Sequence, residues 1–238
     1  MKRFVIAVTL MLLSVTSALA EKSERDNDET QFISYGFKIG FDATSLYMDN
    51  IVIDNHTIDR YNRDSQVGVN LTLFTRFNFS KFYFQTGAVG NFSRAAITFD
   101  KNSWNPESTE ENPAAFSMEG YCIDIPFQFG YNVIKDREYC MALFCGPRIR
   151  IPIQNTYNTK FVNFGQENIV EIPYNFITTL SFGLNCSIDR TFFDIEYDLG
   201  INNISKRIDY DTTPQDNGGS VTLDRRHGTF SFSIGMIF

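Results

Sequence analysis

The sequence predicts an all-β fold: an eight-stranded antiparallel up-and-down transmembrane β-barrel. Three observations support this prediction. Large apolar residues alternate with small or polar ones in eight separate runs, the connections between the runs are alternately short and long, and the apolar residues are too numerous to fit inside a barrel. Beyond the N-terminus, no apolar run of the 238 residues reaches the length of about 18 that a membrane-spanning helix needs.

Each run has the period of two that places alternate side chains on opposite faces of a strand. In the first, YGFKIGF, three rings and an isoleucine alternate with Gly, Lys and Gly. The expected strands lie within 35–41, 67–77, 82–93, 121–133, 139–151, 176–188, 193–201 and 230–238. Four apolar residues have the opposite parity and break the pattern: Phe74, Phe144, Ile177 and Ile237.

The connections alternate in length. Three are short, at 79–81, 134–137 and 189–190, and four are long and polar, near 44–65, 99–117, 153–173 and 203–226. Short periplasmic turns, long external loops and an even number of strands are typical of outer-membrane barrels. We therefore expect one barrel domain over 34–238, of the small outer-membrane type, with both termini at the short-turn end.

The packing of the two faces indicates which one is outside. The apolar faces hold about 40 mostly large side chains, whereas a filled eight-stranded barrel holds about 12. Ten of the fifteen glycines have the parity of the polar face, which suits a crowded interior. The apolar face is therefore expected to contact lipid; a soluble β-sandwich or lipocalin-like barrel is the alternative.

The first 20 residues have the pattern of a cleaved signal peptide. Lys2 and Arg3 precede an apolar stretch over 4–13, and Ala18-Leu19-Ala20 forms a small-residue cleavage site. The following residues, 21–33, are expected to form a short periplasmic segment. These features predict export and a location in the outer membrane.

The polar face carries charges that strand parity directs into the barrel. The expected set contains four cations and five carboxylates: Lys38, Asp42, Arg76, Asp124, Arg148, Arg150, Asp194, Glu196 and Asp198. Unpaired buried charge is costly, so opposite charges are expected to pair and to plug the interior. The expected partners of Arg148 and Arg150 are Asp124 or the acidic row of the seventh strand. A narrow porin-like channel for small solutes is the alternative.

The four cysteines are expected to remain free thiols. Parity places Cys122 and Cys140 inside and Cys145 and Cys186 on the lipid face. A hairpin that turns near 135–136 would set Cys140 opposite about residue 131, and residue 145 is expected to face about 181. Strand geometry then keeps each pair of the same face too far apart for a bond.

Other chemistry finds little support in the sequence. The net charge of −7 argues against nucleic-acid binding, and no catalytic, metal-binding or cofactor-binding motif occurs. An outer-membrane lipid-modifying enzyme is a weaker alternative, because no carboxylate is obviously placed to orient His227. No catalytic residue, metal or cofactor is therefore expected.

Several motifs resemble the PorT-like outer membrane β-barrel proteins of Bacteroidota, over roughly 34–238. They are Ile123-Asp124-Ile125-Pro126, Gly146-Pro147 and the aromatic-acidic stretch over 193–197. The resemblance implies the barrel fold but no defined activity, since the family is functionally diverse; one member serves a protein-secretion and gliding system. The terminal Phe238 resembles the signal that the barrel assembly machinery reads.

These observations favour a structural or interaction role over transport or catalysis. The expected partners are outer-membrane lipid, the barrel assembly machinery and a protein that meets the long loops or belongs to the envelope machinery. The chain is expected to be a monomer.

Overall fold

A computed structural model describes residues 31–53, 56–57, 61–99, 114–136, 139–153, 156–162, 167–211 and 222–238. The expected signal peptide, most of the segment over 21–33 and parts of the long connections lie outside these residues. In the described part, no helix is long and apolar enough to cross a membrane.

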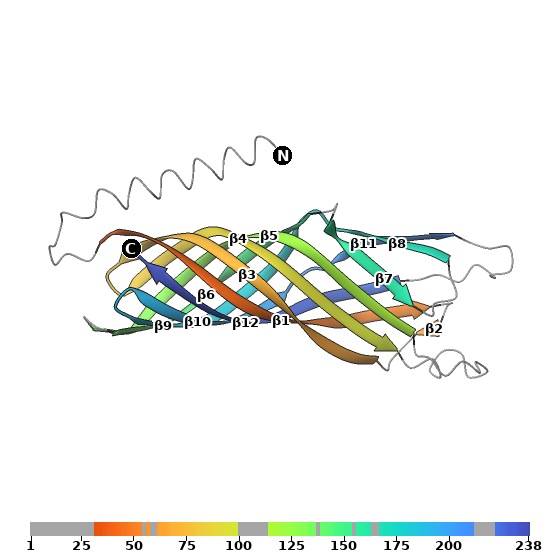
Figure 1. Cartoon of the computed structure of the whole chain (residues 1–238), viewed down its shortest axis with the longest axis horizontal. Coiled ribbons are helices and arrows are strands. Elements are labelled where there is room, and N and C mark those ends of the chain that lie inside the picture. The colour runs from red at the N-terminus through yellow and green to blue at the C-terminus, as the bar shows by residue number, and fades with distance from the viewer. Residues whose placement is uncertain are drawn as a thin grey trace.

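Eight long antiparallel strands close into a barrel, which confirms the predicted fold class (Figure 1). They are β1 (Ile33–Ile53), β3 (Tyr61–Phe79), β4 (Phe82–Phe99), β5 (Ala114–Lys135), β6 (Tyr139–Pro152), β9 (Ile177–Ile188), β10 (Thr191–Gly200) and β12 (Thr222–Ile237). Each strand pairs with the next in this order, and β12 pairs with β1 to close the barrel. Because the ladder of backbone hydrogen bonds is closed, no strand edge is exposed to the membrane. An unpaired backbone group in lipid would cost on the order of several kcal/mol.

The short connections form tight turns at one end of the barrel. Ser80 and Asp189 both have a φ of 53°, a left-handed conformation that two-residue hairpin loops require. Ser80-Lys81 joins β3 to β4, and Asp189-Arg190 joins β9 to β10. Two of the three predicted short turns therefore lie where the sequence places them.

The predicted long loops contain strand, which corrects their ranges. The β1–β12 pairing continues to Val52 and Thr222, and the β4–β5 pairing continues to Phe99 and Ala114. Four short strands add to this end: β2 (His56–Thr57), β7 (Asn158–Val162), β8 (Glu167–Pro173) and β11 (Ser205–Asp211). The predicted strands end too early because the apolar residues change from the outward to the inward face at this end of the barrel. The outward apolar pattern therefore stops while the strands continue.

This change of faces occurs at a single step along β4 and β5. Phe92 and Tyr121 are paired and project outward, whereas the next outward pair is Arg94 and Glu119. Beyond that step the inward positions become apolar, and Ala95, Ile97 and Phe99 on β4 are completely buried. Apolar side chains on the outside of a barrel suit contact with lipid. Apolar side chains on the inside, with polar ones outside, suit a barrel surrounded by water, so the barrel leaves the membrane here.

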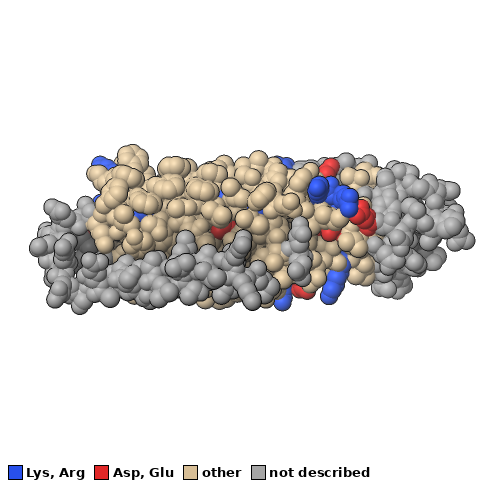
Figure 2. All heavy atoms as spheres, turned by 90° about the horizontal axis from the view of Figure 1, so that it is seen from above, with Lys and Arg blue, Asp and Glu red and all other residues tan. Residues whose placement is uncertain are grey.

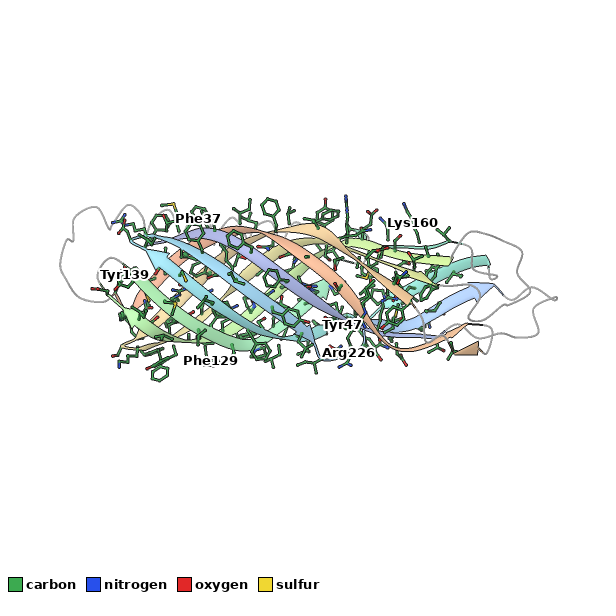
Figure 3. All side chains as sticks on the ribbon, turned by 90° about the horizontal axis from the view of Figure 1, so that it is seen from below. Phe37, Tyr47, Phe129, Tyr139, Lys160 and Arg226 are labelled. Carbon is green, nitrogen blue, oxygen red and sulfur yellow. The ribbon has the colours of Figure 1, made fainter. Side chains whose placement is uncertain are left out.

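The lipid-facing band covers the part of the barrel nearer the short turns. Its outward rings include Phe41, Phe129 and Phe176, all at least 60% exposed. Figure 3 shows Phe37, Phe129 and Tyr139 projecting outward, and Figure 2 shows charged side chains gathering toward the end that carries the long connections. The surface thus divides into an apolar band and a polar extension, defined as the barrel beyond the Arg94–Glu119 step.

Three of the four residues that broke the apolar pattern have packing roles. Phe74 and Phe144 point inward, where their rings lie against Gly36 and Gly183. Ile177 lies in the apolar core of the extension. A ring laid over an inward glycine fills space that neither residue fills alone, as in the pairing of aromatic residues with strand glycines.

Gly183→Ala is expected to destabilise the barrel by about 1–3 kcal/mol, because overpacking forces the neighbouring groups to move. An added Cβ would lie 2.1 Å from the Phe144 ring and 2.7 Å from the Ile195 carbonyl oxygen. Urea unfolding in phospholipid vesicles measures the change. Gly90→Ala is the control, since its nearest neighbour is a carbonyl oxygen 3.9 Å away; equal losses at both positions would contradict the packing.

All four cysteines are free, as predicted, but the predicted register of the β5–β6 hairpin is wrong. Cys140 lies opposite Lys135 rather than residue 131, because the connection turns beyond 136 and β5 has an irregularity between Asn132 and Ile134. Cys145 faces Phe182, one residue from the expected position, and is exposed on the lipid side.

Candidate functional site in the barrel interior

The nine charged residues expected in the interior all lie there. They come from β1, β3, β5, β6 and β10, and each is between 0% and 9% exposed. Because successive side chains of a strand point to opposite faces, the alternation that places rings in lipid places these groups inside. The structure brings seven of the nine together in one ion-pair network and leaves Asp42 and Arg76 outside it.

The acidic row of β10 is the centre of this network. Lys38 Nζ donates to Asp194 Oδ2 at 2.8 Å and to Glu196 Oε2 at 3.2 Å. Arg148 reaches across the barrel and pairs with both Glu196 and Asp198. Two cations on separate strands therefore pair with three carboxylates that lie on one strand.

Arg150 and Asp124 form a second arm of the network. The guanidinium donates two parallel hydrogen bonds, from Nε to Asp124 Oδ1 at 2.9 Å and from a terminal nitrogen to Oδ2 at 2.8 Å. Such bidentate pairs are the strongest and most directional of the charge-assisted bonds. Arg148 lies 3.9 Å from the same carboxylate, so Asp124 connects the two arginines.

Asp42 and Arg76 depart from the expectation that opposite charges pair. Asp42 accepts hydrogen bonds from the amides of Asn70, at 2.6 Å, and Asn91, at 2.9 Å. Arg76 donates to Gln85 Oε1 at 2.9 Å, and its guanidinium lies 4.2 Å from the ring centre of Tyr83. Amide dipoles and an aromatic face thus replace the counter-charge, a solution that parity alone does not reveal.

Glutamine side chains connect Arg76 to the acidic row. Gln85 donates to Gln128 Oε1 at 3.0 Å, and Gln128 donates to Glu196 Oε1 at 2.9 Å. This chain of hydrogen bonds crosses from β3 to β10 through the middle of the barrel. Buried hydrogen-bond networks restrict the arrangements that their side chains can adopt.

An aromatic layer lies at the short-turn end of the interior. Phe74, Tyr83, Phe144 and Phe192 are each at most 5% exposed, and the Phe74 and Phe192 rings meet edge to face at 5.6 Å. Arg76 also lies within 6.0 Å of both of these ring centres. The rings close the interior below the charged network.

An apolar core fills the other end, and sequence reasoning missed it. Its buried members come from five segments of the chain: Leu46, Ala95, Ile97, Phe99, Phe116, Met118, Ile177 and Ile204. The period of two does continue along β4 through Phe99, with the apolar residues on the opposite face. That reversal is the sequence signal that would have located this core.

One buried ion pair lies beside this core. Arg225 pairs with Glu171, both side chains are fully buried, and the guanidinium lies 4.3 Å from the ring centre of Phe116. Burial alone would lower the pKa of Arg225, but the Glu171 carboxylate beside it raises that pKa, so Arg225 stays charged. Burial also raises the pKa of Tyr157, whose hydroxyl lies 3.5 Å from the same guanidinium.

His227 points into the barrel and is 2% exposed. A lipid-modifying site would need its base on the outer surface, so this placement removes the histidine on which that alternative depended. Among the described residues, no group of three or more His, Cys, Asp or Glu side chains is arranged to hold a metal ion.

The interior therefore has three layers: aromatic rings, a charged and amide network, and an apolar core. What this arrangement does chemically is to neutralise charge and fill space. Ion pairs at this depth add little net stability, but the loss of one partner leaves an uncompensated charge.

Known proteins show which family shares this architecture. The sequence matches the family described as "Outer membrane protein beta-barrel domain" over residues 20–206, and no curated protein matches the chain. Among solved structures, OprG from Pseudomonas aeruginosa superposes with a TM-score of 0.50 and 11% identity, covering 90% of this chain and 99% of OprG.

Two further structures are more distant. Ail of Yersinia pestis has a TM-score of 0.35 and 12% identity, covering 87% of this chain and all of Ail. The outer membrane protease OmpT from Escherichia coli has a TM-score of 0.39 and 8% identity, covering 88% and 99% of the two chains. The family match covers most of the sequence and the closed barrel agrees with it: the chain belongs to the outer membrane protein beta-barrel domain family.

Proposed function

We propose that this protein is a closed outer-membrane barrel, with a structural or interaction role, whose polar extension meets a partner outside the membrane. The observation that supports closure is the succession of three packed layers along the interior. A solute would have to pass the Phe74–Phe192 rings, the network around Glu196 and the core around Phe116. The interior of an eight-stranded barrel is narrow enough for side chains to fill it, which supports closure.

Planar-bilayer recording tests closure. The purified protein is expected to give no steady single-channel current in 1 M KCl, because the interior offers no continuous aqueous path. The variant Arg148→Ala lacks the guanidinium that spans the network. Brief openings of this variant would show that the charged side chains plug the interior but that the plug can be opened. Steady conductance by the unaltered protein would instead support a narrow channel for small solutes.

The extension offers a surface for a protein partner. Val162, Val170 and Tyr174 lie in or beside β7 and β8 and are 49%, 56% and 42% exposed, away from the lipid-facing band. A photo-crosslinking residue at position 170 is expected to give a discrete adduct on intact cells, and one at the lipid-facing position 232 is not. If neither position gave a protein adduct, the support for a protein partner would be removed.

We also propose that the chain is related to the PorT-like proteins and that Phe238 takes part in barrel assembly. The Asp124 of the PorT-like motif binds Arg150, and Pro126 in the same motif lies opposite Arg148, so the motif residues lie at one arm of the network.

The backbone of Phe238 exchanges two hydrogen bonds with Tyr35, at 2.7 and 3.1 Å, where β12 and β1 close the barrel. These two bonds can form only when β12 meets β1, which supports a role of Phe238 in barrel assembly. Phe238→Ala should slow insertion into vesicles assisted by the assembly machinery.

A further inference from the structure

The short strands β8 and β11 form a separate two-stranded sheet in the polar extension. They pair with each other in antiparallel fashion, and in the described part of the chain they pair with no other strand. Figure 1 shows them side by side near the end that carries the long connections. We call this sheet the flap and define it as residues 167–173 and 205–211.

Both strands of the flap break from the barrel at the same level. Residues 174–176 separate β8 from β9, and residues 201–204 separate β10 from β11. The two breaks lie side by side, because the Tyr174 amide donates to the Ile204 carbonyl oxygen at 2.9 Å. A few residues at the ends of elements are the usual place where a hinge absorbs changes of backbone dihedral angle. The paired breaks therefore provide a hinge about which the two strands would move as one body.

The flap contributes little to the apolar core of the extension. None of the eight buried core residues found in the described part of the chain lies in its two strands, and Ile208 packs against that core only partly buried. Its outer side chains meet solvent: Val170 is 56% exposed, and Lys206 and Arg207 are exposed too. Segments with few buried apolar contacts open at a lower free-energy cost than the rest of a fold.

A buried ion pair holds the flap against its neighbours. Glu171 of β8 pairs with Arg225 of β12, and neither side chain is exposed to solvent. The hydroxyl of Tyr157, which precedes β7, lies 3.5 Å from the same guanidinium. The Ile204 amide also donates to the Arg225 carbonyl oxygen, at 3.0 Å, but this bond lies at the hinge. Beyond the hinge, the flap, β12 and the segment before β7 thus meet at one guanidinium.

This ion pair is only partly satisfied. Arg225 Nε and Nη1 and Glu171 Oε2 are buried and form no hydrogen bond with any described residue. A buried donor or acceptor without a partner retains its full desolvation cost, and a buried ion pair adds little net stability. Water would satisfy these three atoms if the flap swung outward. The closed position is therefore favoured by a small difference between large terms.

We propose that the flap swings about its hinge and that the Arg225–Glu171 pair is the latch that holds it closed. Opening would expose the side of the apolar core that Ile208 covers, while β7 and β12 stay in place. The charged network in the barrel lies on other strands, so opening would leave it intact. The proposal does not depend on a partner of the extension.

Double electron–electron resonance on the mature protein in vesicles tests the motion. One pair of nitroxide labels is placed at position 160 on β7 and position 206 on β11, where both native lysines are exposed, in a cysteine-free background. A reference pair is placed at positions 94 and 160, on β4 and β7 of one continuous sheet. The unaltered protein is expected to give one dominant distance for each pair.

Removing one partner of the latch should open the flap. Glu171→Gln and Arg225→Met each leave an uncompensated buried charge, which hydration in the open position relieves. Each is expected to raise the open fraction by about tenfold or more, seen as a second, longer 160–206 distance, while the 94–160 distance stays the same.

Two further variants separate a latch from general destabilisation. Glu171→Met/Arg225→Met replaces both charges by apolar side chains and should keep the flap closed, because hydration no longer favours opening. Arg207→Gln breaks the exposed 3.2 Å contact with Asp209 on the flap itself and should change neither distance.

Three results would overturn the proposal. The first is an unchanged 160–206 distance in both single variants. The second is a double variant, or Arg207→Gln, that opens as far as the single variants do. The third is a 94–160 distance that broadens together with the 160–206 distance, because the extension would then unfold as a whole rather than open at a hinge.

Discussion

Arg148→Met is expected to destabilise the barrel by about 3–5 kcal/mol, the usual cost of removing one partner from a buried charge network. Arg148 pairs with Glu196 and Asp198 and lies 3.9 Å from Asp124. Without it, the fully buried Asp198 loses its cation, and the buried Glu196 keeps only Lys38. Urea unfolding in phospholipid vesicles, followed by heat-dependent gel migration, measures the loss.

Neutralising the partners provides the control for this prediction. In the triple variant Arg148→Met/Glu196→Gln/Asp198→Asn, no uncompensated charge remains, and most of the lost stability should return. Arg94→Met removes an exposed arginine from its 3.8 Å contact with Glu119 and should cost at most about 1 kcal/mol. A triple variant as unstable as Arg148→Met would show that shape, rather than charge balance, dominates the interior.

Phe116→Ala is expected to cost about 3–5 kcal/mol, as large-to-small changes at buried aromatic positions do. Its side chain is fully buried, lies 5.0 Å from the Phe161 ring centre and covers the Arg225 guanidinium at 4.3 Å. The loss should fall on the extension, because the lipid-facing band does not depend on this core. Limited proteolysis should therefore cleave the extension of the variant while the membrane-embedded part still migrates as a folded barrel.

The neighbouring position provides the comparison. Ser117 lies on the same strand but points outward, so Ser117→Ala should change neither proteolysis nor stability by more than about 0.5 kcal/mol. If Phe116→Ala unfolded the whole barrel in one step, the extension and the membrane part would be a single cooperative unit rather than two.

The barrel itself could be predicted from the sequence because lipid imposes a simple rule on it. Every second residue from Tyr121 to Tyr131 is a large apolar side chain, and the eight such runs placed the eight strands. The same parity placed all nine charged residues inside. Their ion-pair partners could be predicted only in part. Parity shows which face of the strand a side chain is on, but it does not show which residues of neighbouring tilted strands lie at the same height.

The extension could not be predicted by the same rule because water replaces lipid there. Ile97 and Phe99 continue the period of two, but with the apolar face inward, and a search for outward rings stops at Phe92. The partners of Asp42 and Arg76 were also inaccessible, because asparagine, glutamine and tyrosine replace the opposite charge. The β5–β6 register failed for a local reason, the irregularity between Asn132 and Ile134.

The central claim is that one outward face of the barrel meets lipid and then water, with the change at the Phe92–Arg94 step. Nitroxide labels at single cysteines, introduced at 84, 88, 90, 92, 94, 96 and 98 in a cysteine-free background in vesicles, test it directly. Collision rates with oxygen should be high through position 92, and those with a water-soluble nickel complex should be high from position 94. Low oxygen collision rates over 84–92, or high ones through 98, would contradict this assignment of the two faces.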